Sequence, residues 1–499
     1  MPRSPGHAQR ALAALLCGAA MPLGFAPLGW YPLPVLALAG LALLLAGQPP
    51  RRAALYGWLF GLGQFGAGVY WVYISIYLYG GDAGLALSLL VTALFVAALA
   101  LYPALFAWLA ARVGSAPRPA FFLLLFPALW TLVEWLRGWL FTGFPWLDLG
   151  YSQIDSPLAG LAPVAGVYAV GWAAALAAGL LAWAVRGGGR ARGPALAGLL
   201  VLALGGWGLG RQHWTRPAGE PLQATLVQGN IAQDLKWKPD QQQATLERYV
   251  ELTEQHPDSR VVVWPETAIP AFYDQVEADF LTPLRERMAA RDSWLLTGIP
   301  VLDRAHGWRY YNAVISLNQP DHFYYKVHLV PFGEYLPLRD QLARLLDFLP
   351  VPEADFSAGS PDQPLLQAAG YPVGASICYE IAFGELLRHG LPEAAWLVNV
   401  SNDAWFGDSL APHQHLEMAR MRARESERYL LRATNTGISA IIDDRGRIVE
   451  RSPQFEAATV TADIVPRTGA TPYVRWGNAP VVLAAGFLFL AGVLRLRGV

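Results

Sequence analysis

Charged side chains are scarce in this chain. Lys, Arg, Asp and Glu make up 15% of its 499 residues, whereas 54% are hydrophobic. Soluble domains usually carry roughly 25% charged residues, so the deficit predicts that part of the chain lies in lipid. The formal net charge is -1, which leaves no basic excess to attract a phosphate backbone. We therefore expect no nucleic-acid partner.

Cysteine is scarcer still, with only Cys17 and Cys378. One lies in an apolar segment and the other in a polar one, so the sequence does not predict a disulfide framework. Cys17 is interpreted as a small buried apolar residue. His413 and His415 are two residues apart, a spacing that splays them on a helix, and no cysteine pair accompanies them. We predict no metal site and no cofactor.

What the chain has in abundance is long apolar runs, each near the ~20 residues that cross a bilayer as a helix. We count eight, and the first two are separated by so short a break that they form either two spans or an incomplete hairpin. The residues from Met21 to Gly24 lack the small residues of a signal-peptide cleavage site. The runs are Ala11 to Gly29, Trp30 to Gly47, Ala53 to Tyr77, Gly84 to Ala110, Pro119 to Leu140, Pro157 to Val185, Gly193 to Gly210, and Asn478 to Leu496.

The arginines between these runs predict an orientation. Every second loop is basic, and basic loops stay in the cytoplasm. The N-terminus is therefore predicted to be cytoplasmic, with residues 1–212 as a seven-span region and 476–499 as a last span. Residues 221–468 would then lie outside the cytoplasmic membrane. The basic positions are Arg3, Arg10, Arg51, Arg52, Arg112, Arg118, Arg186, Arg190, Arg192, Arg495 and Arg497.

Two charges interrupt the fifth run. Glu134 and Arg137 are three residues apart, at helical spacing, and charges in a span are costly unless they are paired or face a cavity. We interpret them as a self-satisfied pair near the interface. The aromatic loop that follows, Thr142 to Tyr151, is either an interfacial belt or the lip of a lipid-entry site.

Between Pro221 and Thr468 the pattern changes to short β-like runs separated by helical stretches, which is typical of layered α/β domains. Pro350 to Pro352 and Ser357 to Pro364 are predicted loops. The predicted strands are Leu222 to Ile231, Arg260 to Pro265, Trp294 to Val301, Ala313 to Leu317, Phe323 to Val327, Tyr371 to Cys378, Trp396 to Ser401, Ile438 to Asp443 and Ala458 to Ile464. The predicted helices are Gln241 to Gln255, Val276 to Arg291 and His413 to Arg432.

Cys378 stands where a β-like run, Tyr371 to Ile377, gives way to a helix-like run, Ile381 to Arg388. A side chain at such an elbow is presented outward, and the backbone N–H groups that follow point at whatever it attacks. A core cysteine on a strand is the alternative interpretation. The neighbouring residues favour a nucleophile.

Three residues of complementary chemistry fall at predicted strand ends: Glu266, Lys326 and Cys378. A carboxylate can take the thiol proton, an ammonium can stabilise an oxyanion, and the sulfur can attack a carbonyl. Alone, each is weak evidence, because a glutamate after a strand is usually solvated and a lone lysine usually extends to solvent. Together they predict acyl transfer through a thioester.

These residues resemble a known superfamily. WPE, then a lysine followed by PFGE, then CYE is similar to the ordered Glu-Lys-Cys pattern of the nitrilase, or carbon-nitrogen hydrolase, superfamily. The strings GNIAQDLKW, PFGEYLP, ICYE, NVSNDAWFGDS, PHQH and RATNTGISA, with the flanking spans, resemble the apolipoprotein N-acyltransferase family over nearly the whole chain. The resemblance implies a nitrilase-like αββα sandwich beside an α-helical transmembrane bundle.

The resemblance also implies a ping-pong reaction. An acyl chain passes from a membrane phospholipid to Cys378 and then to the α-amino group of the diacylglyceryl-cysteine of an apolipoprotein. Glu266 would be the general base, Lys326 would steady the tetrahedral intermediate, and Glu334 and Glu380 would support the site. Trp237, Tyr379, Trp405 and Phe406 either shield the thioester or pack in the core. We expect a monomer in the bacterial inner membrane, with its catalytic domain on the periplasmic side.

Two other functions remain open from the residues alone. A membrane-anchored amidase of a small substrate would use the same triad, but one anchoring span would suffice for it. A transporter would need polar residues in several spans and inverted repeats; the spans hold chiefly Glu134 and Arg137, and no repeat is evident.

Overall fold

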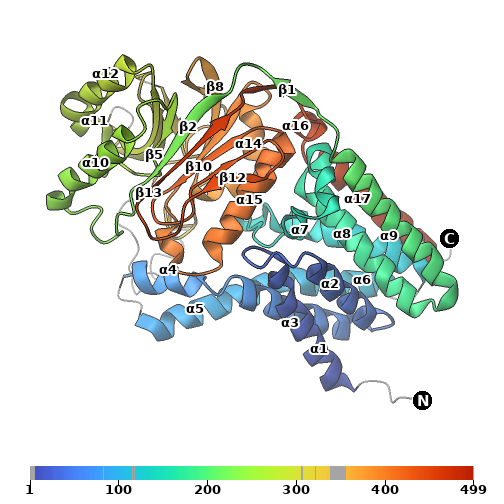
Figure 1. Cartoon of the computed structure of the whole chain (residues 1–499). Coiled ribbons are helices and arrows are strands. Elements are labelled where there is room, and N and C mark those ends of the chain that lie inside the picture. The colour runs from blue at the N-terminus through green and yellow to red at the C-terminus, as the bar shows by residue number, and fades with distance from the viewer. Residues whose placement is uncertain are drawn as a thin grey trace. The chain divides into compact units, whose positions relative to one another are not determined.

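The computed structural model describes residues 6–81, 84–114, 116, 118–304, 307–320, 322–337 and 356–497. The chain divides into two compact units. The first comprises Met1–Tyr73, Gly84–Gln212 and Arg475–Val499, and the second comprises Ile74–Ala83 and His213–Val474. The first unit is helical and the second is built on β-sheets (Figure 1). The predicted turn at Pro350 to Pro352 lies outside the described residues.

The helices of the first unit follow the predicted apolar runs. Within the described residues, three helical stretches are long and apolar enough to cross a membrane: Gly84–Gly114, Pro157–Arg186 and Gly189–Leu209. A bent pair of helices would make a fourth. The helices are α1 (His7–Ala20), α2 (Pro32–Leu45), α3 (Pro50–Gly68), α5 (Gly84–Leu99), α6 (Leu101–Gly114), α7 (Phe126–Arg137), α8 (Ala162–Arg186), α9 (Gly189–Leu209) and α17 (Ala479–Arg497).

The bent pair corrects the prediction of one continuous helix from Ala53 to Tyr77. Helix α3 ends at Gly68, and α4 (Val72–Tyr79) starts after a short break at an angle of 54° to it. Most of α4 belongs to the second unit. Its Ser75 hydroxyl donates to the carbonyl of Trp405, and its Tyr79 hydroxyl donates to that of Ala404. These polar contacts explain why the apolar run does not continue as one rod.

Small residues let α1 and α3 pack closely. A Cβ atom added at Gly18 of α1 would lie 1.9 Å from the carbonyl oxygen of Phe60, and one added at Gly63 would lie 2.2 Å from that of Leu15. Two helix backbones approach this closely only where side chains are absent, a pattern common in membrane helix bundles. Glycine at these positions is therefore a packing requirement.

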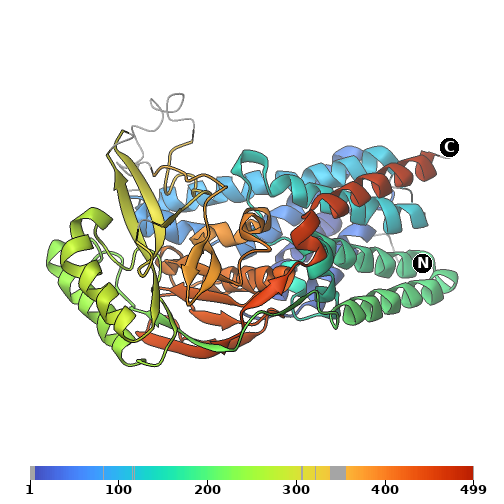
Figure 2. The same cartoon turned by 90° about the horizontal axis from the view of Figure 1, so that it is seen from above.

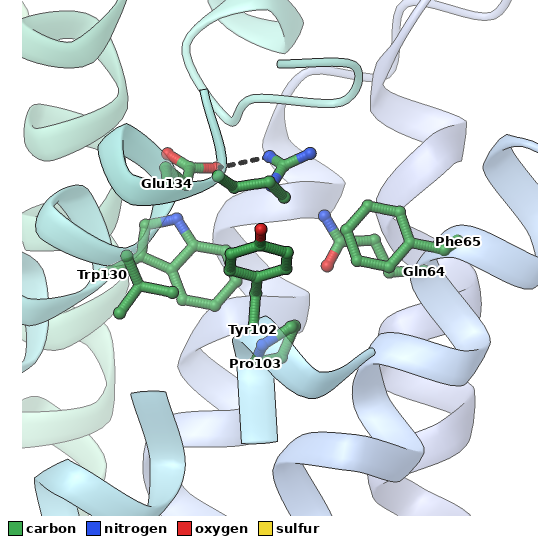
Figure 3. A pocket seen from close by; sticks show the side chains of 8 residues that line it. Gln64, Phe65, Tyr102, Pro103, Trp130 and Glu134 are labelled. Carbon is green, nitrogen blue, oxygen red and sulfur yellow. Dashed lines mark ion pairs between the residues drawn. The ribbon is translucent and has the colours of Figure 1, made fainter. Parts of the chain in front are cut away.

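Glu134 and Arg137 form the ion pair that we predicted, but each also has a shorter contact outside the pair. Their side chains are 4.0 Å apart (Figure 3). Arg137 binds Asp148 at 2.5 Å and donates to the carbonyl of Phe144, while Glu134 accepts from the backbone N–H of Leu149 at 2.8 Å. Both charges therefore bind the loop 142–151, whose second half is buried. Most of the loop is thus packed within its unit rather than forming an exposed belt.

The second unit contains two six-stranded sheets. One has the strand order β13-β2-β3-β4-β5-β6 and the other has the order β12-β11-β10-β9-β8-β7. The first is formed by β2 (Leu222–Gln228), β3 (Val261–Val263), β4 (Trp294–Asp303), β5 (Arg309–Ser316), β6 (Phe323–Tyr325) and β13 (Ala458–Ile464). The second is formed by β7 (Leu366–Ala368), β8 (Tyr371–Ile377), β9 (Trp396–Ser401), β10 (Leu430–Thr434), β11 (Ala440–Ile442) and β12 (Ile448–Arg451).

Alternation along the strands builds the layers. Val261 and Val263 point into an apolar core that also contains Val398 and Val400 of the other sheet, whereas Val262 points into a second core under the helices. Helices α10 (Pro239–Glu254), α11 (Tyr273–Val276) and α12 (Thr282–Ala290) cover one outer face. Helices α14 (Gly384–Leu387) and α15 (Ala411–Ser426) cover the other (Figures 1 and 2). The unit is the αββα sandwich that the resemblance implied.

Two predicted helical segments of the second unit differ from the structure near Cys378 and beyond α15. The helix predicted from His413 to Arg432 ends at Ser426, because Glu427 has a left-handed backbone (φ 47°) and β10 begins at Leu430. The helix-like run after Cys378 is a 3-10 helix, Cys378–Ala382, followed by the short α14. Apolar periodicity alone does not reveal these breaks, because the residues beyond Ser426 are as buried as those before it.

Candidate active site

The three predicted residues stand at strand ends in the two facing sheets. Glu266 lies just beyond β3, Lys326 directly follows β6, and Cys378 directly follows β8. Cys378 adopts φ 52°, a left-handed conformation that is uncommon for residues other than glycine. The chain therefore turns sharply at this residue, as an elbow that presents a side chain requires.

The structure brings these side chains together in a buried place. Lys326 is 1% exposed, Glu266 7% and Cys378 9%. The ammonium of Lys326 lies 3.9 Å from Glu266 Oε1 and 2.7 Å from Glu334 Oε1. Glu266 and Lys326 are both close enough to Cys378 for their charges to act on its thiol: Glu266 raises the pKa of the thiol and Lys326 lowers it. A base, a cation and a sulfur therefore share one desolvated site.

Electrostatics keep the sulfur protonated at rest. Burial raises the pKa of the Cys378 thiol to about 12, Glu266 adds to the rise, and Lys326 and the Ser401 hydroxyl oppose it. Because a thiolate is the attacking species, the proton must leave as the sulfur attacks. Glu266 is the adjacent carboxylate that can accept it.

Lys326 remains a cation despite its burial. Desolvation lowers the pKa of its ammonium, but the carboxylates of Glu334 and Glu266 raise it by more, and the net shift is upward. Glu334 is itself held by the backbone N–H of Val330 at 2.8 Å. A fixed ammonium is suited to stabilise a developing oxyanion.

Glu266 is oriented by residues that the sequence did not single out. Asn312 of β5 donates to Oε1 at 2.7 Å, and the backbone N–H of Asn402 donates to Oε2 at 2.8 Å. Buried Lys236 donates to the Glu266 carbonyl oxygen at 3.1 Å. Lys236 and Asn402 lie in strings that carried the family resemblance, which is the only signal that pointed to them. Nothing in the sequence marked Asn312.

Glu380 links the elbow to the lysine segment. Its carboxylate accepts from the backbone N–H groups of Ile377, Val327 and His328, and from the Tyr324 hydroxyl, at 2.6 to 3.0 Å. Burial raises the pKa of Glu380 to about 7, and the hydrogen-bond donors limit the rise. Its contacts make it a brace between the segment after β6 and the end of β8.

The predicted aromatic residues divide into two groups. Trp237 is 53% exposed and Trp405 is 36% exposed, with the Trp405 ring 4.7 Å from that of Tyr79 on α4. Tyr379 is nearly buried and packs on Phe383. Phe406 makes an edge contact with the ring of His415. Of these four aromatic residues, Trp237 and Trp405 are therefore the two whose rings are exposed.

Comparison with known families agrees with this geometry. Residues 223–473, which contain the sandwich, match the carbon-nitrogen hydrolase family, so this part of the chain is a carbon-nitrogen hydrolase domain. Residues 17–180 match the apolipoprotein N-acyltransferase N-terminal domain. The chain belongs to the apolipoprotein N-acyltransferase family.

Relatives match over nearly the full length. An apolipoprotein N-acyltransferase from Methylococcus capsulatus is 52% identical, covering 97% of this chain and 96% of the relative. One from Nitrosomonas europaea is 46% identical, covering 97% of each. Among solved structures, a nitrilase-superfamily member from Saccharomyces cerevisiae aligns with a TM-score of 0.38 and 20% identity, covering 51% of this chain and 93% of that one.

Proposed function

We propose that this protein transfers an acyl chain from a membrane phospholipid, through a thioester on Cys378, to the α-amino group of the diacylglyceryl-cysteine that begins an apolipoprotein. The observation that carries the proposal is the convergence of Glu266, Lys326 and Cys378 in one buried site of a chain from this family.

In the first half-reaction, Glu266 takes the thiol proton while the sulfur attacks the ester carbonyl of the phospholipid. Lys326 donates a hydrogen bond to the oxyanion, which develops in a site with little water, where such a bond is strong. The C–O bond then breaks, and the leaving alkoxide takes the proton from Glu266. The products are a lysophospholipid and an acyl thioester.

In the second half-reaction, the neutral amine of the apolipoprotein attacks the thioester. Glu266 takes a proton from the amine and returns it to the departing sulfur, so an amide forms and the thiol is restored. Two sequential steps require only one lipid substrate in the site at a time. This division suits an enzyme whose substrates both reside in a bilayer, because the membrane raises their effective concentration.

The proposed setting is the bacterial cytoplasmic membrane, with eight spans and the catalytic domain on the periplasmic side. The candidate spanning helices support a membrane setting. The alternation of arginine-rich and arginine-poor loops supports the orientation. The exposed rings of Trp237 and Trp405 are suited to contact the acyl chains.

The decisive experiment is intact-mass measurement of the purified full-length protein after exposure to phospholipid alone. Its mass should increase by one fatty acyl group, and Cys378→Ser should show no thioester. An unmodified wild-type protein would overturn the proposal. A thioester that water discharges quickly, with no transfer to a lipopeptide amine, would favour a hydrolase instead.

A further inference from the structure

A buried polar cluster lies behind the elbow that carries Cys378. Asp403, His415 and Arg432 are at most 2% exposed. Arg432 donates to Asp403 Oδ2 at 2.8 Å and approaches His415 Nδ1 at 2.9 Å. The three residues come from the segment after β9, from α15 and from β10, so the cluster exists only in the folded domain.

The contacts of His415 define its protonation. The carbonyl oxygen of Cys378 can only accept a hydrogen bond, so the Nε2 atom that faces it carries a ring proton, while Nδ1 faces both Arg432 at 2.9 Å and Asp403 Oδ1 at 3.1 Å. That Nε2 atom is 3.1 Å from the carbonyl oxygen of Cys378. Burial and the charge of Arg432 lower the pKa of His415, with Asp403 opposing, which keeps the ring neutral. His415 therefore donates to the backbone of Cys378.

That hydrogen bond acts on an unusual backbone. Cys378 has φ 52°, a conformation that persists in a non-glycine residue only where the surroundings enforce it. Its carbonyl oxygen lies within reach of His415 Nε2 and of the Asn399 amide nitrogen, at 3.1 and 3.4 Å. Orienting this peptide plane fixes the direction in which the sulfur points.

The same cluster also reaches the general base. Asp403 accepts from the Ser401 hydroxyl at 2.8 Å, and that hydroxyl also affects the pKa of Cys378. Asn402, the neighbour of Asp403, donates its backbone N–H to Glu266. Anchoring Asp403 through Arg432 therefore fixes the segment that holds both Ser401 and Asn402.

A wholly buried ion pair costs more than apolar side chains of similar volume. In this protein the hydrogen bonds around the Asp403–Arg432 pair lead to Cys378 and to the segment that holds Glu266. We propose that His415 is a positioning residue: it holds the Cys378 carbonyl, and thereby the sulfur, in the reactive orientation, and the Asp403–Arg432 pair fixes its ring. This inference rests on the proposed role of Cys378 as nucleophile.

The test uses full-length protein in phospholipid-containing micelles, and compares His415→Leu, which has no donor, with His415→Gln, whose amide can still donate. The control is His256→Gln, a part-buried histidine bonded to Thr459 and Thr461 of β13, in the other sheet. We measure the single-turnover rate of thioester formation against phospholipid concentration, together with the thermal unfolding midpoint.

For His415→Leu we expect a rate at saturating lipid roughly 100-fold lower, the scale of a small misplacement of reacting atoms, with half-saturation unchanged. His415→Gln should recover most of the rate, and His256→Gln should match the wild type. A wild-type rate in His415→Leu would overturn the proposal. The proposal would also be overturned if the rate fell equally in His415→Leu and His415→Gln, and if that fall matched the decrease in the amount of folded protein.

A second measurement separates this proposal from the proposed function. If wild-type protein forms no thioester, the proposed function fails, but the alkylation rate of Cys378 by iodoacetamide needs no lipid and still tests the positioning. In a Cys17→Ser background, alkylation should be roughly tenfold slower in His415→Leu, because a displaced sulfur loses the stabilisation of its thiolate by Lys326. Equal alkylation rates in the two proteins would overturn the inference.

Discussion

Lys326 donates a 2.7 Å hydrogen bond to Glu334, whereas it lies 3.9 Å from Glu266. Glu334 thus holds the ammonium close to the base without letting it form a direct hydrogen bond there. This separation leaves Glu266 able to accept a proton. It also leaves the lysine within the site, where an oxyanion develops during acyl transfer.

We expect Glu334→Gln to slow thioester formation roughly 10- to 100-fold. General-base catalysis usually contributes at least the upper end of this range, and the substitution weakens the base without removing it. Without the Glu334 charge, Lys326 pairs with Glu266 and weakens it as a base. Single-turnover acylation with phospholipid measures the effect. The matched control is Glu385→Gln, an exposed glutamate paired with Arg388, which should acylate normally. Similar rates in the two variants would refute this role of Glu334.

Glu266→Gln should change two reactions of Cys378 in opposite directions. The Glu266 charge contributes to the raised pKa of the thiol, so its removal lowers that pKa and should speed alkylation by iodoacetamide at pH 7. Acylation by phospholipid should fall by at least roughly 100-fold, because the general base is lost. Both rates are measured on the same protein, in a Cys17→Ser background.

Lys326→Met provides the comparison. The positive charge of Lys326 lowers the pKa of the Cys378 thiol. Removing that charge should therefore slow both the alkylation and the acylation of Cys378. If Glu266→Gln and Lys326→Met shifted the alkylation rate in the same direction, the electrostatic description of the site would be wrong.

Lys236 should make stability depend on pH. Burial lowers the pKa of its ammonium to about 8, and Glu266 opposes the shift. The unfolded chain therefore binds more protons between about pH 8 and the unfolded pKa of roughly 10.4, so stability rises with pH in that window. Below about pH 8 the buried ammonium lowers the free energy of unfolding by its full amount, on the order of 3 kcal/mol.

We expect Lys236→Met to raise the thermal unfolding midpoint at pH 7 and to raise it less at pH 10, measured by intrinsic fluorescence. Lys238→Met, at a neighbouring exposed position, should shift the midpoint at neither pH. A gain from Lys236→Met that is equal at both pH values would show that the ammonium is not the cause.

Arg137→Leu should destabilise the helical unit. The substitution leaves Glu134 and Asp148 without their buried cation, and breaking a buried pair costs roughly 3–5 kcal/mol. We expect a lower unfolding midpoint and new protease cleavage within the loop 142–151. Arg52→Leu, at an exposed position, should behave as wild type. An intact loop in Arg137→Leu would mean that other contacts suffice to hold it.

The proposed topology places the loop before α9 in the cytoplasm and α10 in the periplasm. Cysteines introduced as Gly189→Cys, where a side chain has open space, and as Asp240→Cys, which is exposed, should differ in labelling. In intact spheroplasts, a membrane-impermeant maleimide should label position 240 and not position 189. The reverse pattern would invert the proposed orientation.

The sequence by itself determined the division into apolar helices and an α/β domain, because runs near 20 apolar residues and strands with two-residue alternation have few alternative structures. It also singled out Glu266, Lys326 and Cys378 as candidates, because residues of complementary chemistry stand at predicted strand ends. It did not reveal where α15 stops or where α3 breaks. Those ends depend on a left-handed residue, Glu427, and on hydrogen bonds from α4 to the segment around Trp405.

Only the tertiary structure decided which groups form hydrogen bonds and ion pairs with the buried polar residues. The donors that orient Glu266 come from Asn312 and Asn402, 46 and 136 residues away, and the cluster behind Cys378 joins three separate elements. Arg137 likewise binds Asp148 across a loop rather than only Glu134 on its own helix. Local patterns encode burial and backbone geometry, but hydrogen bonds are short and directional, so their partners are fixed only when the sheets and helices have packed.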